Sequence, residues 1–388
     1  MKLKMIVAVA GLACLTGCQQ KKEAPAEGVS VIDVAVHEDA VSCSLSEIAD
    51  YSCVILPTSD SLLLGGEITR IRLSGDRLYV SDGTLLCQVD TAGNNLRIIQ
   101  RKGEGPEEYH AIRDFIIDND RAWIDCWNTR TLKCYDWNNR MIQKIDIGMW
   151  VQSIHKEKGN FYLYTGNNSL GENDNCQLYV LNPESGQLEQ HFKPIDPVKA
   201  NYLFTIDGNN FMQMHDQSLC FTQLFNDTIY SLTPKALQPR YVLNFDGQNI
   251  PASFFNRNYT DIADFFTQLH KEGRFAYGTD LFIDTGQTYW ASYFYQKECN
   301  LSVIPKDNPQ KQVRITTLKI DQLFDYPVQL TETPIFASGN GTVTILLQPA
   351  EIMEYAEQHL SVEQQEALKQ RIHFIEDQNP ILLLVRPF

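Results

Sequence analysis

The stretch Arg101-Lys-Gly-Glu-Gly-Pro-Glu-Glu-Tyr109 decides how the rest of the chain is organised. It separates two apolar runs that are typical of β-strands, Leu96–Ile99 and Ile112–Asp118. Glycines 103 and 105 permit backbone angles that other residues avoid, and Pro106 fixes one such angle. We interpret the stretch as the junction at which one small β-sheet ends and the next begins.

Short strand-like runs recur around this junction at nearly even spacing. Four precede it and four follow it, at residues 68–73, 77–81, 85–90, 96–99, 112–118, 121–126, 132–137 and 142–147. Equivalent turns follow Asp90, Asp136 and Leu181, which are 46 and 45 residues apart. Four short strands in about 45 residues is the size of a propeller blade. The pattern predicts an all-β, six-bladed β-propeller. The alternative, a β-sandwich with extra strands, gives no reason for the period.

The later sets of runs follow the same spacing, except that the sixth is incomplete. We expect the fourth set to comprise residues 202–207, 211–215, 219–230 and 240–245. The sixth set has only three runs and ends at Ile381–Val385. Val29–Val34 is a spare strand near the start of the chain. If it paired with the last blade, with Ile32 near Leu383, it would close the ring and remove an open sheet edge.

Residues 1–17 have the pattern of a bacterial lipoprotein signal peptide. Lys2 and Lys4 precede an apolar stretch, Met5–Leu15, that is too short to span a bilayer as a mature helix. Leu15-Thr-Gly-Cys18 then resembles a lipobox, in which the cysteine thiol is lipidated and acyl chains such as palmitate anchor the protein. An ordinary secretory signal is the alternative. We expect a tether at residues 18–28, the propeller at 29–388, and a location in the bacterial cell envelope, at the outer membrane, with the leaflet undetermined.

Net charge excludes one class of partner. The chain has a net charge of −15, and removal of the signal peptide with its two lysines makes this −17. No lysine and arginine stripe compensates, so nucleic-acid binding is not expected. The membrane is the expected partner through the lipid anchor, together with a glycan, a peptide or another envelope protein.

Eight cysteines remain after the signal peptide and lipidated Cys18, and their spacing is wide and irregular. No CxxC pair is present, so no zinc site is expected. Most cysteines lie in apolar runs, as buried thiols do. Cys126 and Cys134 are a possible disulfide across a hairpin, with two buried thiols as the alternative.

The long connections indicate which face of the propeller has a function. In a blade whose strands are lettered a to d outwards from the axis, the d-to-a and b-to-c connections emerge on one face. The long connections here are all of these two kinds, at residues 165–175, 247–277 and 348–380. Helical insertions are predicted at about 251–273 and 350–377, because apolar residues recur at helical spacing and Ser361-Val-Glu-Gln364 matches a capping box. They serve either as lids on the propeller or as docking helices.

Candidate ligand-binding residues cluster near the opening stretch on this face. Aromatic, acidic and basic side chains around a funnel suit a carbohydrate or a peptide. The candidates are Arg101, Lys102, Glu104, Glu107, Glu108, Tyr109, His110, Trp127, Arg130 and Trp150. The alternative is that the glycines make a tight turn, Tyr109 packs between blades and the charges are solvated.

Motifs for catalysis, metals and cofactors are missing from the sequence. It contains no Gly-x-Ser-x-Gly elbow, no HExxH pair and no calcium-loop spacing. Asp284-Thr-Gly-Gln-Thr-Tyr-Trp290 resembles the Asp-box turn of sialidases, but it has an extra residue and occurs once. We expect a binding module without a cofactor or metal. A hydrolase or lyase acting on a polysaccharide stays the alternative, and it requires two carboxylates that converge in the funnel, one of them with a raised pKa.

These features together resemble a known family. The lipobox, the Gly103–Tyr109 junction, the run after it and the Asn379-Pro-Ile-Leu-Leu-Leu-Val-Arg386 ending are similar to those of six-bladed β-propeller lipoproteins of Bacteroidota, which are NHL-like. The resemblance covers nearly the whole mature chain. It implies a fold and a location, and no general activity.

Overall fold

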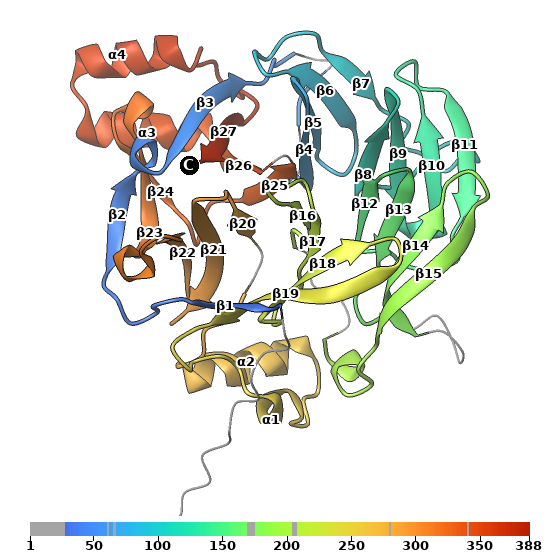
Figure 1. The fold of residues 1–388 in the computed structure, drawn as a ribbon. Coiled ribbons are helices and arrows are strands. Elements are labelled where there is room, and N and C mark those ends of the chain that lie inside the picture. Colours follow the sequence, from blue (N-terminus) through green and yellow to red (C-terminus); the bar gives the residue numbers. More distant parts are fainter. Residues whose placement is uncertain are drawn as a thin grey trace, which may run out of the picture.

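The computed structural model describes residues 28–388 except for 60–61, 65–66, 169–174, 204–207, 279–280 and 340. Six β-sheets stand around a central axis, and Figure 1 views this ring along the axis. The predicted all-β, six-bladed β-propeller is therefore confirmed. The signal peptide, Cys18 and the tether up to residue 27 lie outside the described residues.

Each blade is an antiparallel sheet of four strands that follow one another in the chain from the innermost strand outwards. Blade 6 is the exception, because its outermost strand comes from near the start of the chain. Blade 1 contains β4 (Arg70–Ser74), β5 (Arg77–Ser81), β6 (Leu86–Asp90) and β7 (Arg97–Ile99). Blade 2 contains β8 (Phe115–Asp118), β9 (Arg121–Cys126), β10 (Thr131–Tyr135) and β11 (Met141–Asp146). Blade 3 contains β12 (Ser153–Glu157), β13 (Asn160–Tyr164), β14 (Cys176–Asn182) and β15 (Gln187–Pro194).

The other three blades carry extra strands or take one from the start of the chain. Blade 4 contains β16 (Phe211–Gln213), β17 (Leu219–Phe221), β18 (Thr228–Thr233) and β19 (Ala236–Asn244). Blade 5 contains β20 (Phe282–Asp284), β21 (Thr288–Tyr295), β22 (Glu298–Pro305) and β23 (Val313–Ile320), with β24 (Tyr326–Gln329) beside β23. Blade 6 contains β25 (Ile335–Gly339), β26 (Thr342–Leu347), β27 (Ile381–Pro387) and β3 (Ala49–Ile55).

A side chain caps the same turn in each of the first three blades. Asp90 Oδ1 accepts hydrogen bonds from the backbone N–H groups of Ala92 (3.0 Å) and Asn94 (2.8 Å). Asp136 and Asn182 accept equivalent bonds in the next two blades. Asx residues favour such turns because the side chain replaces a backbone acceptor. These turns give the sequence its period.

The strand that closes the ring differs from the predicted one. β3 pairs with β27 along seven residues, with Cys53 opposite Leu383. The predicted closing strand Val29–Val34 contains β1 (Ser30–Asp33), which pairs in parallel with β19 of blade 4 and places Ile32 opposite Leu243. The prediction that Ile32 lies near Leu383 is therefore wrong.

The physical reason lies in the outer edges of the last three blades. The chain start runs along them in order, with β1 on blade 4, β2 (Ala40–Ser44) on blade 5 and β3 on blade 6. Each contact uses unpaired backbone groups of an outer strand, which any extended segment can pair with. Three strands thus cover three edges, and only the last completes the ring.

Blade 4 also departs from the prediction. Its innermost strand is β16, whereas Tyr202 follows a short 3-10 helix and residues 204–207 lie outside the described part. The predicted run 219–230 is two strands separated by a turn. Phe225 in this turn has a left-handed backbone (φ 63°). Its ring packs on that of Phe265, from a helix between blades 4 and 5, with the ring centroids 5.1 Å apart. An apolar residue in a turn hid the break from the sequence pattern.

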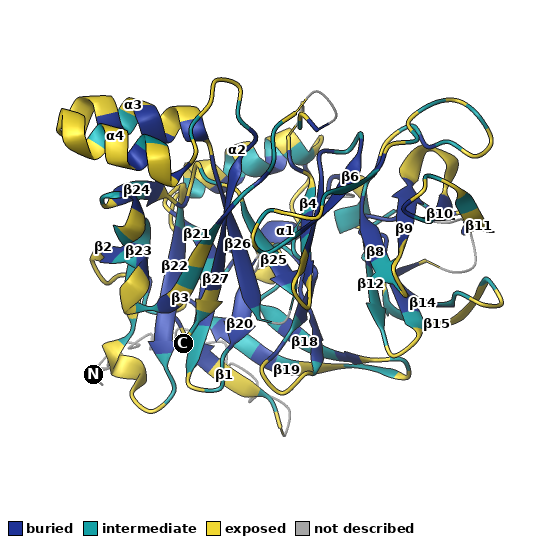
Figure 2. Ribbon diagram, turned by 90° about the horizontal axis from the view of Figure 1, so that it is seen from above, coloured by how far each residue is buried: buried dark blue, intermediate teal, exposed yellow. Residues whose placement is uncertain are grey.

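The described residues contain four α-helices, all in links that emerge on one face of the ring, and the edge-on view of Figure 2 shows α2, α3 and α4 along this face. α1 (Ala252–Phe255) and α2 (Ile262–Glu272) join blades 4 and 5, and α3 (Pro349–His359) and α4 (Val362–Arg371) lie between β26 and β27. Short 3-10 helices occur at Leu45–Glu47, Trp127–Thr129, Lys199–Asn201, Pro309–Lys311 and Asp321–Leu323.

Capping residues set the helix ends. Asp261 accepts a hydrogen bond from the Asp264 N–H (2.9 Å) at the start of α2, and Gly273 ends this helix with φ 65°. Ser361 and Gln364 form the expected capping box of α4. α4 ends at Arg371, short of the predicted limit near residue 377, and the Ile375 side chain beyond it is 51% exposed.

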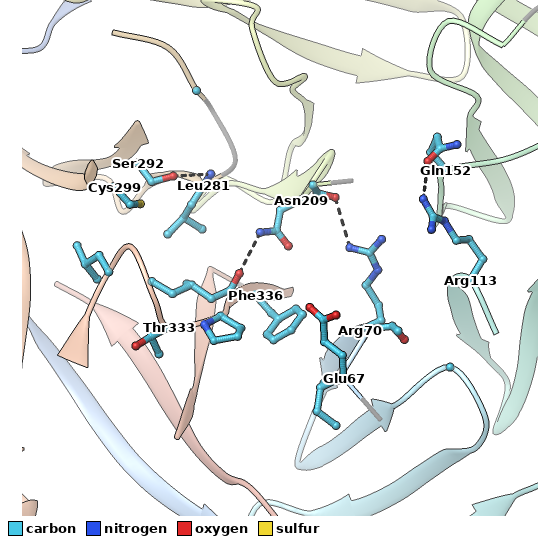
Figure 3. A pocket seen from close by; sticks show the side chains of 18 of the residues that line it. Glu67, Arg70, Arg113, Gln152, Asn209, Leu281, Ser292, Cys299, Thr333 and Phe336 are labelled. Carbon is cyan, nitrogen blue, oxygen red and sulfur yellow. Dashed lines mark hydrogen bonds between the residues drawn. The ribbon is translucent and has the colours of Figure 1, made fainter. Parts of the chain in front are cut away.

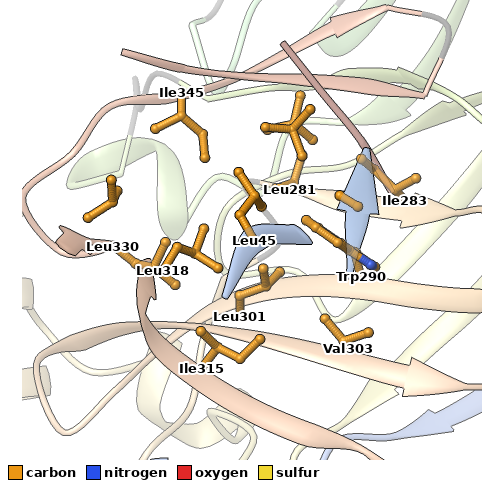
Figure 4. Packing of buried hydrophobic residues seen from close by; sticks show 14 of the residues in the cluster. Leu45, Leu281, Ile283, Trp290, Leu301, Val303, Ile315, Leu318, Leu330 and Ile345 are labelled. Carbon is orange, nitrogen blue, oxygen red and sulfur yellow. The ribbon is translucent and has the colours of Figure 1, made fainter. Parts of the chain in front are cut away.

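The hydrophobic core lies between neighbouring blades. One large cluster joins blades 4, 5 and 6, and Figure 4 shows part of it around Trp290 of β21, which is 2% exposed. Leu45, from the 3-10 helix after β2, packs into the same cluster. The start of the chain therefore contributes side chains to this core as well as backbone pairing.

All eight cysteines of the described residues are free thiols. Cys126 lies opposite Thr131, and Cys134 lies opposite Trp123. Because side chains alternate along a strand, Cys126 packs in the core between blades 1 and 2, and Cys134 packs between blades 2 and 3. The possible Cys126–Cys134 disulfide is not formed, since the two thiols are on opposite faces of one sheet.

Candidate functional site

The links that join successive blades surround a cavity of about 910 Å³ at the axis, on the face that carries the helices. Every blade contributes a residue at or just before the start of its innermost strand. These residues are Arg70, Arg113, Gln152, Asn209, Leu281 and Ile335. The cavity size is typical of small-molecule sites. The opposite face has short turns, such as the one at Asn119 and Asp120.

A buried ion cluster holds three blades together beneath the cavity. Asp114 has no exposed side-chain surface and accepts from Arg72 Nη2 at 2.7 Å, with Arg70 Nε at 3.3 Å. The backbone N–H groups of Phe115 (2.8 Å) and Ile154 (2.9 Å) also donate to it. Burial alone would raise the pKa of Asp114, but Arg72 and Arg70 outweigh burial and hold this pKa below its usual value.

Polar side chains brace the cavity wall, as Figure 3 shows. Arg113 Nη2 donates to Gln152 Oε1 at 2.7 Å, which joins the links entering blades 2 and 3. Asn209 Oδ1 accepts from the Ala337 N–H at 3.0 Å, which joins blade 4 to blade 6 across the ring. Arg70 Nη1 donates to the Gly208 carbonyl at 3.3 Å. The cavity is therefore preformed by contacts between blades.

Aromatic side chains extend the site outward from the axis. Trp127 is 38% exposed and lines the cavity. Its ring centroid is 6.2 Å from that of Trp150, and the Arg130 guanidinium lies 4.0 Å from the Trp150 ring centroid. The structure thus brings together three predicted candidates, Trp127, Arg130 and Trp150.

The seven other candidates are six residues of the opening stretch and His110 directly after it, and none of them lines the cavity. Tyr109 is fully buried, and its hydroxyl donates to the carbonyls of Thr84 (3.1 Å) and Ile99 (3.3 Å). Glu108 Oε2 accepts from the Gly105 N–H at 2.9 Å, and a Cβ added at Gly103 would overlap the same carboxylate.

The remaining members of this stretch are wholly or partly exposed. His110 Nδ1 lies 3.2 Å from the Glu104 carboxylate, and Glu107 uses its backbone carbonyl to accept from the Tyr135 hydroxyl. Arg101 and Lys102 pair through their backbone with Tyr109. The cavity lining begins only at the next residues, Ala111 to Arg113.

The carboxylates near the cavity differ in their exposure. Glu67 and Glu332 line it and are exposed. Asp125 is fully buried behind Arg113, whose backbone N–H donates to the Asp125 carbonyl at 3.2 Å. Burial first, and then the charge of Asp114, raise the pKa of Asp125 well above its usual value. This acid does not line the cavity.

His155, whose side chain is partly buried, is a second titratable group near the axis. Its ring stacks on Phe211 with centroids 5.5 Å apart. Burial, assisted by the charge of Arg72, lowers the pKa of His155 to about 3. The imidazole is therefore neutral at physiological pH.

Known families and solved structures include relatives of this chain. A family model described as a domain of unknown function, DUF4934, matches residues 29–386. The chain belongs to the DUF4934 family. No protein with a curated description is matched by its sequence.

Solved structures share the fold of this DUF4934 chain at low sequence identity. A Bacteroides fragilis protein with a provisional description as exported superposes with a TM-score of 0.71 at 16% identity, covering 92% of this chain and 100% of its own. A DUF4221 protein from Bacteroides vulgatus has a TM-score of 0.47 at 9% identity, covering 87% of this chain and 98% of its own. The first of these supports the propeller fold.

Sequence reasoning missed most of the DUF4934 cavity lining. Arg70, Arg113, Gln152 and Asn209 belong to no motif, and their side chains meet only because six links converge. The signal that could have found them is positional, since each lies at or just before the start of an innermost strand. Aligning the blades by their Asx turns would have marked these positions.

Among the described residues, no helix is long and apolar enough to cross a membrane. Nor do three or more His, Cys, Asp or Glu side chains gather among these residues as a metal site.

Proposed function

We propose that this protein is an exported, lipid-anchored binding module that holds a glycan in its axial cavity. The cavity itself carries the proposal, because residues from all six blades line it with amide, guanidinium and hydroxyl groups beside aromatic rings. Convergent polar groups with apolar walls are the usual composition of a ligand site. Peptides and partner lipoproteins are the other ligands to be tested.

The lipobox at Cys18 supports a place in the cell envelope, at the outer membrane, through an acylated cysteine. The provisional description of the Bacteroides fragilis neighbour as exported agrees with this location. The anchor is a prediction from the sequence, and mass spectrometry of the mature amino terminus would test it directly.

A hydrolase or lyase is the less favoured function. Acid catalysis of glycoside cleavage requires an acid with a raised pKa in contact with the substrate. The cavity carboxylates Glu67 and Glu332 are exposed, and the acid with the raised pKa, Asp125, lies behind the wall. This separation favours binding over catalysis.

A glycan and peptide array tests the proposal, with the chain from Gly28 onward, which contains every strand of the propeller. Trp127→Ala removes an exposed aromatic ring from the cavity lining, and Phe388→Ala removes an exposed ring elsewhere. The Phe388 carbonyl accepts from Thr288 beside an a-to-b turn, which places it on the opposite face. We expect glycan binding that Trp127→Ala weakens and Phe388→Ala leaves unchanged. Peptide binding alone, or equal effects of the two variants, would refute the glycan proposal.

A further inference from the structure

A second, smaller pocket lies between blades 3 and 4 on the face of the axial cavity. Its volume is about 180 Å³, roughly that of six water molecules in the liquid. Its lining comes from the ends of β13, β15 and β18 and from the turns and links beside them. The residues are Tyr164, Asn167, Lys193, Lys199, Leu203, Gln223, Leu224, Phe225, Asn226 and Tyr230. Such a space holds one charged group rather than an oligosaccharide.

Two lysines line this small pocket, and neither has a carboxylate partner among the described residues. Lys193 Nζ donates to the Tyr230 hydroxyl at 3.2 Å and lies 4.6 Å from the centroid of that ring. Lys199 Nζ lies 4.1 Å from the Phe255 ring centroid. Within the described part of the chain, neither ammonium forms an ion pair, although Asp196 and Asp227 act on Lys199 from farther away.

Because both lysines line one pocket of about 180 Å³, their charges repel each other. Burial lowers the pKa of Lys199, Asp196 opposes this shift, and the charge of Lys193 lowers the pKa further. Lys193 also draws down the pKa of Tyr230 against the opposing effect of burial. A like-charge pair in a partly desolvated pocket is unfavourable unless an anion relieves the repulsion.

Neutral hydrogen-bonding groups complete the pocket. Asn226 Nδ2 donates to the Tyr230 hydroxyl at 3.4 Å, and Gln223 Nε2 donates to the Tyr164 hydroxyl at 3.1 Å. Lys193 (φ 59°) adopts the left-handed backbone region that side chains other than glycine avoid, and so does Phe225 of the same lining. Strained backbone of this kind persists where the surroundings hold it and is common at binding sites.

We propose that this pocket binds a sulfate or phosphate group, with Lys193 and Lys199 as the cations that hold it. A compact ammonium is a common partner of such oxyanions, and its charge-assisted hydrogen bonds are the strong ones. The group is either a free anion or an ester on a sugar. This site is separate from the axial cavity and does not depend on what that cavity binds.

Equilibrium dialysis with labelled sulfate at fixed ionic strength tests the site. We expect one sulfate per chain. Lys193→Gln and Lys199→Gln should each weaken binding about tenfold, and the double variant about a hundredfold. Lys193→Arg keeps the charge and should retain binding. Lys235→Gln makes the same charge change at an exposed turn on the other face and should leave binding unchanged.

Competition identifies the source of the anion. If glucose 6-sulfate or glucose 6-phosphate displaces labelled sulfate better than free sulfate does, the site holds a sugar ester. If free sulfate and free phosphate displace labelled sulfate as well as these esters do, the site holds a free anion. Failure of the wild-type chain to retain sulfate would overturn the proposal. So would undiminished binding by the double variant, provided its thermal unfolding matches that of Lys235→Gln.

Discussion

Asp114→Asn tests whether the buried ion cluster beneath the cavity holds the blades in place. The substitution keeps the size of the side chain and removes the charge that compensates Arg70 and Arg72. Removing one partner of a buried ion pair costs about 3–5 kcal/mol, since the remaining charge stays desolvated. This is a large part of the roughly 5–15 kcal/mol by which a folded protein is stable.

Asp120→Asn is the matched control for this experiment. Asp120 also contacts two arginines, Arg77 and Arg97, each at 3.0 Å, but its side chain is 50% exposed. Exposed ion pairs contribute about 0–1 kcal/mol. Urea unfolding followed by tryptophan fluorescence gives the change in unfolding free energy for each variant. Equal losses for the two variants would refute the argument from burial.

The same carboxylate predicts a pH dependence. The pKa of Asp114 in the folded chain is below its unfolded value of about 3.9. Its stabilisation is therefore fully present above that unfolded value and is lost as the pH falls through the folded pKa. The gap in stability between wild type and Asp114→Asn should close in strong acid. A gap independent of pH would contradict the role given to the charge.

Three further predictions follow from the fold. Leu383→Cys places a thiol opposite Cys53 in the closing pair of strands, so oxidation should link the two cysteines. The thiol of Leu382→Cys faces the other side of the sheet and should not be linked to Cys53. Equal linking in both variants would disprove the register. Asp125 has a raised pKa in the folded chain, so the stability of the wild type should fall as the pH rises above about 4 towards that pKa. Urea unfolding at pH 4 and pH 8 should show a smaller fall for Asp125→Asn. An unchanged pH profile would count against a protonated Asp125. Burial raises the pKa of Cys126 to about 12, so iodoacetamide should label it at pH 8 only after unfolding, and rapid labelling of the native chain would contradict its burial.

Regular turns explain why the blade count could be predicted from the sequence. Asp90 and Asp136 cap the same turn in successive blades, because each side chain accepts a hydrogen bond from a backbone N–H two residues on. The repeat is therefore visible in the sequence as a recurring turn residue. The break within residues 219–230 was missed because Phe225 occupies its turn and packs on α2. A sequence pattern predicts a turn where hydrogen bonds between neighbouring residues form it. It does not predict a turn that depends on packing against a helix far away in the sequence.

Edge pairing and the cavity depend on positions far apart in the chain. The closing strand could not be identified from the sequence because backbone groups at a sheet edge pair with any extended segment. β1, β2 and β3 are three such segments, and each covers the edge of a different blade. Arg113 and Gln152 meet only in the assembled ring. By contrast, Trp127 stood out in the sequence as an aromatic residue in a predicted loop, and it does line the cavity.

Hydrogen–deuterium exchange with and without the best glycan from the array tests most directly whether the axial cavity is the binding site. The account predicts slower exchange in the links that line the cavity, at residues 67–70, 111–113 and 330–336, when the glycan is bound. Exchange in the a-to-b turns of the opposite face should stay the same. Protection of those turns, with no change in the lining links, would contradict the account.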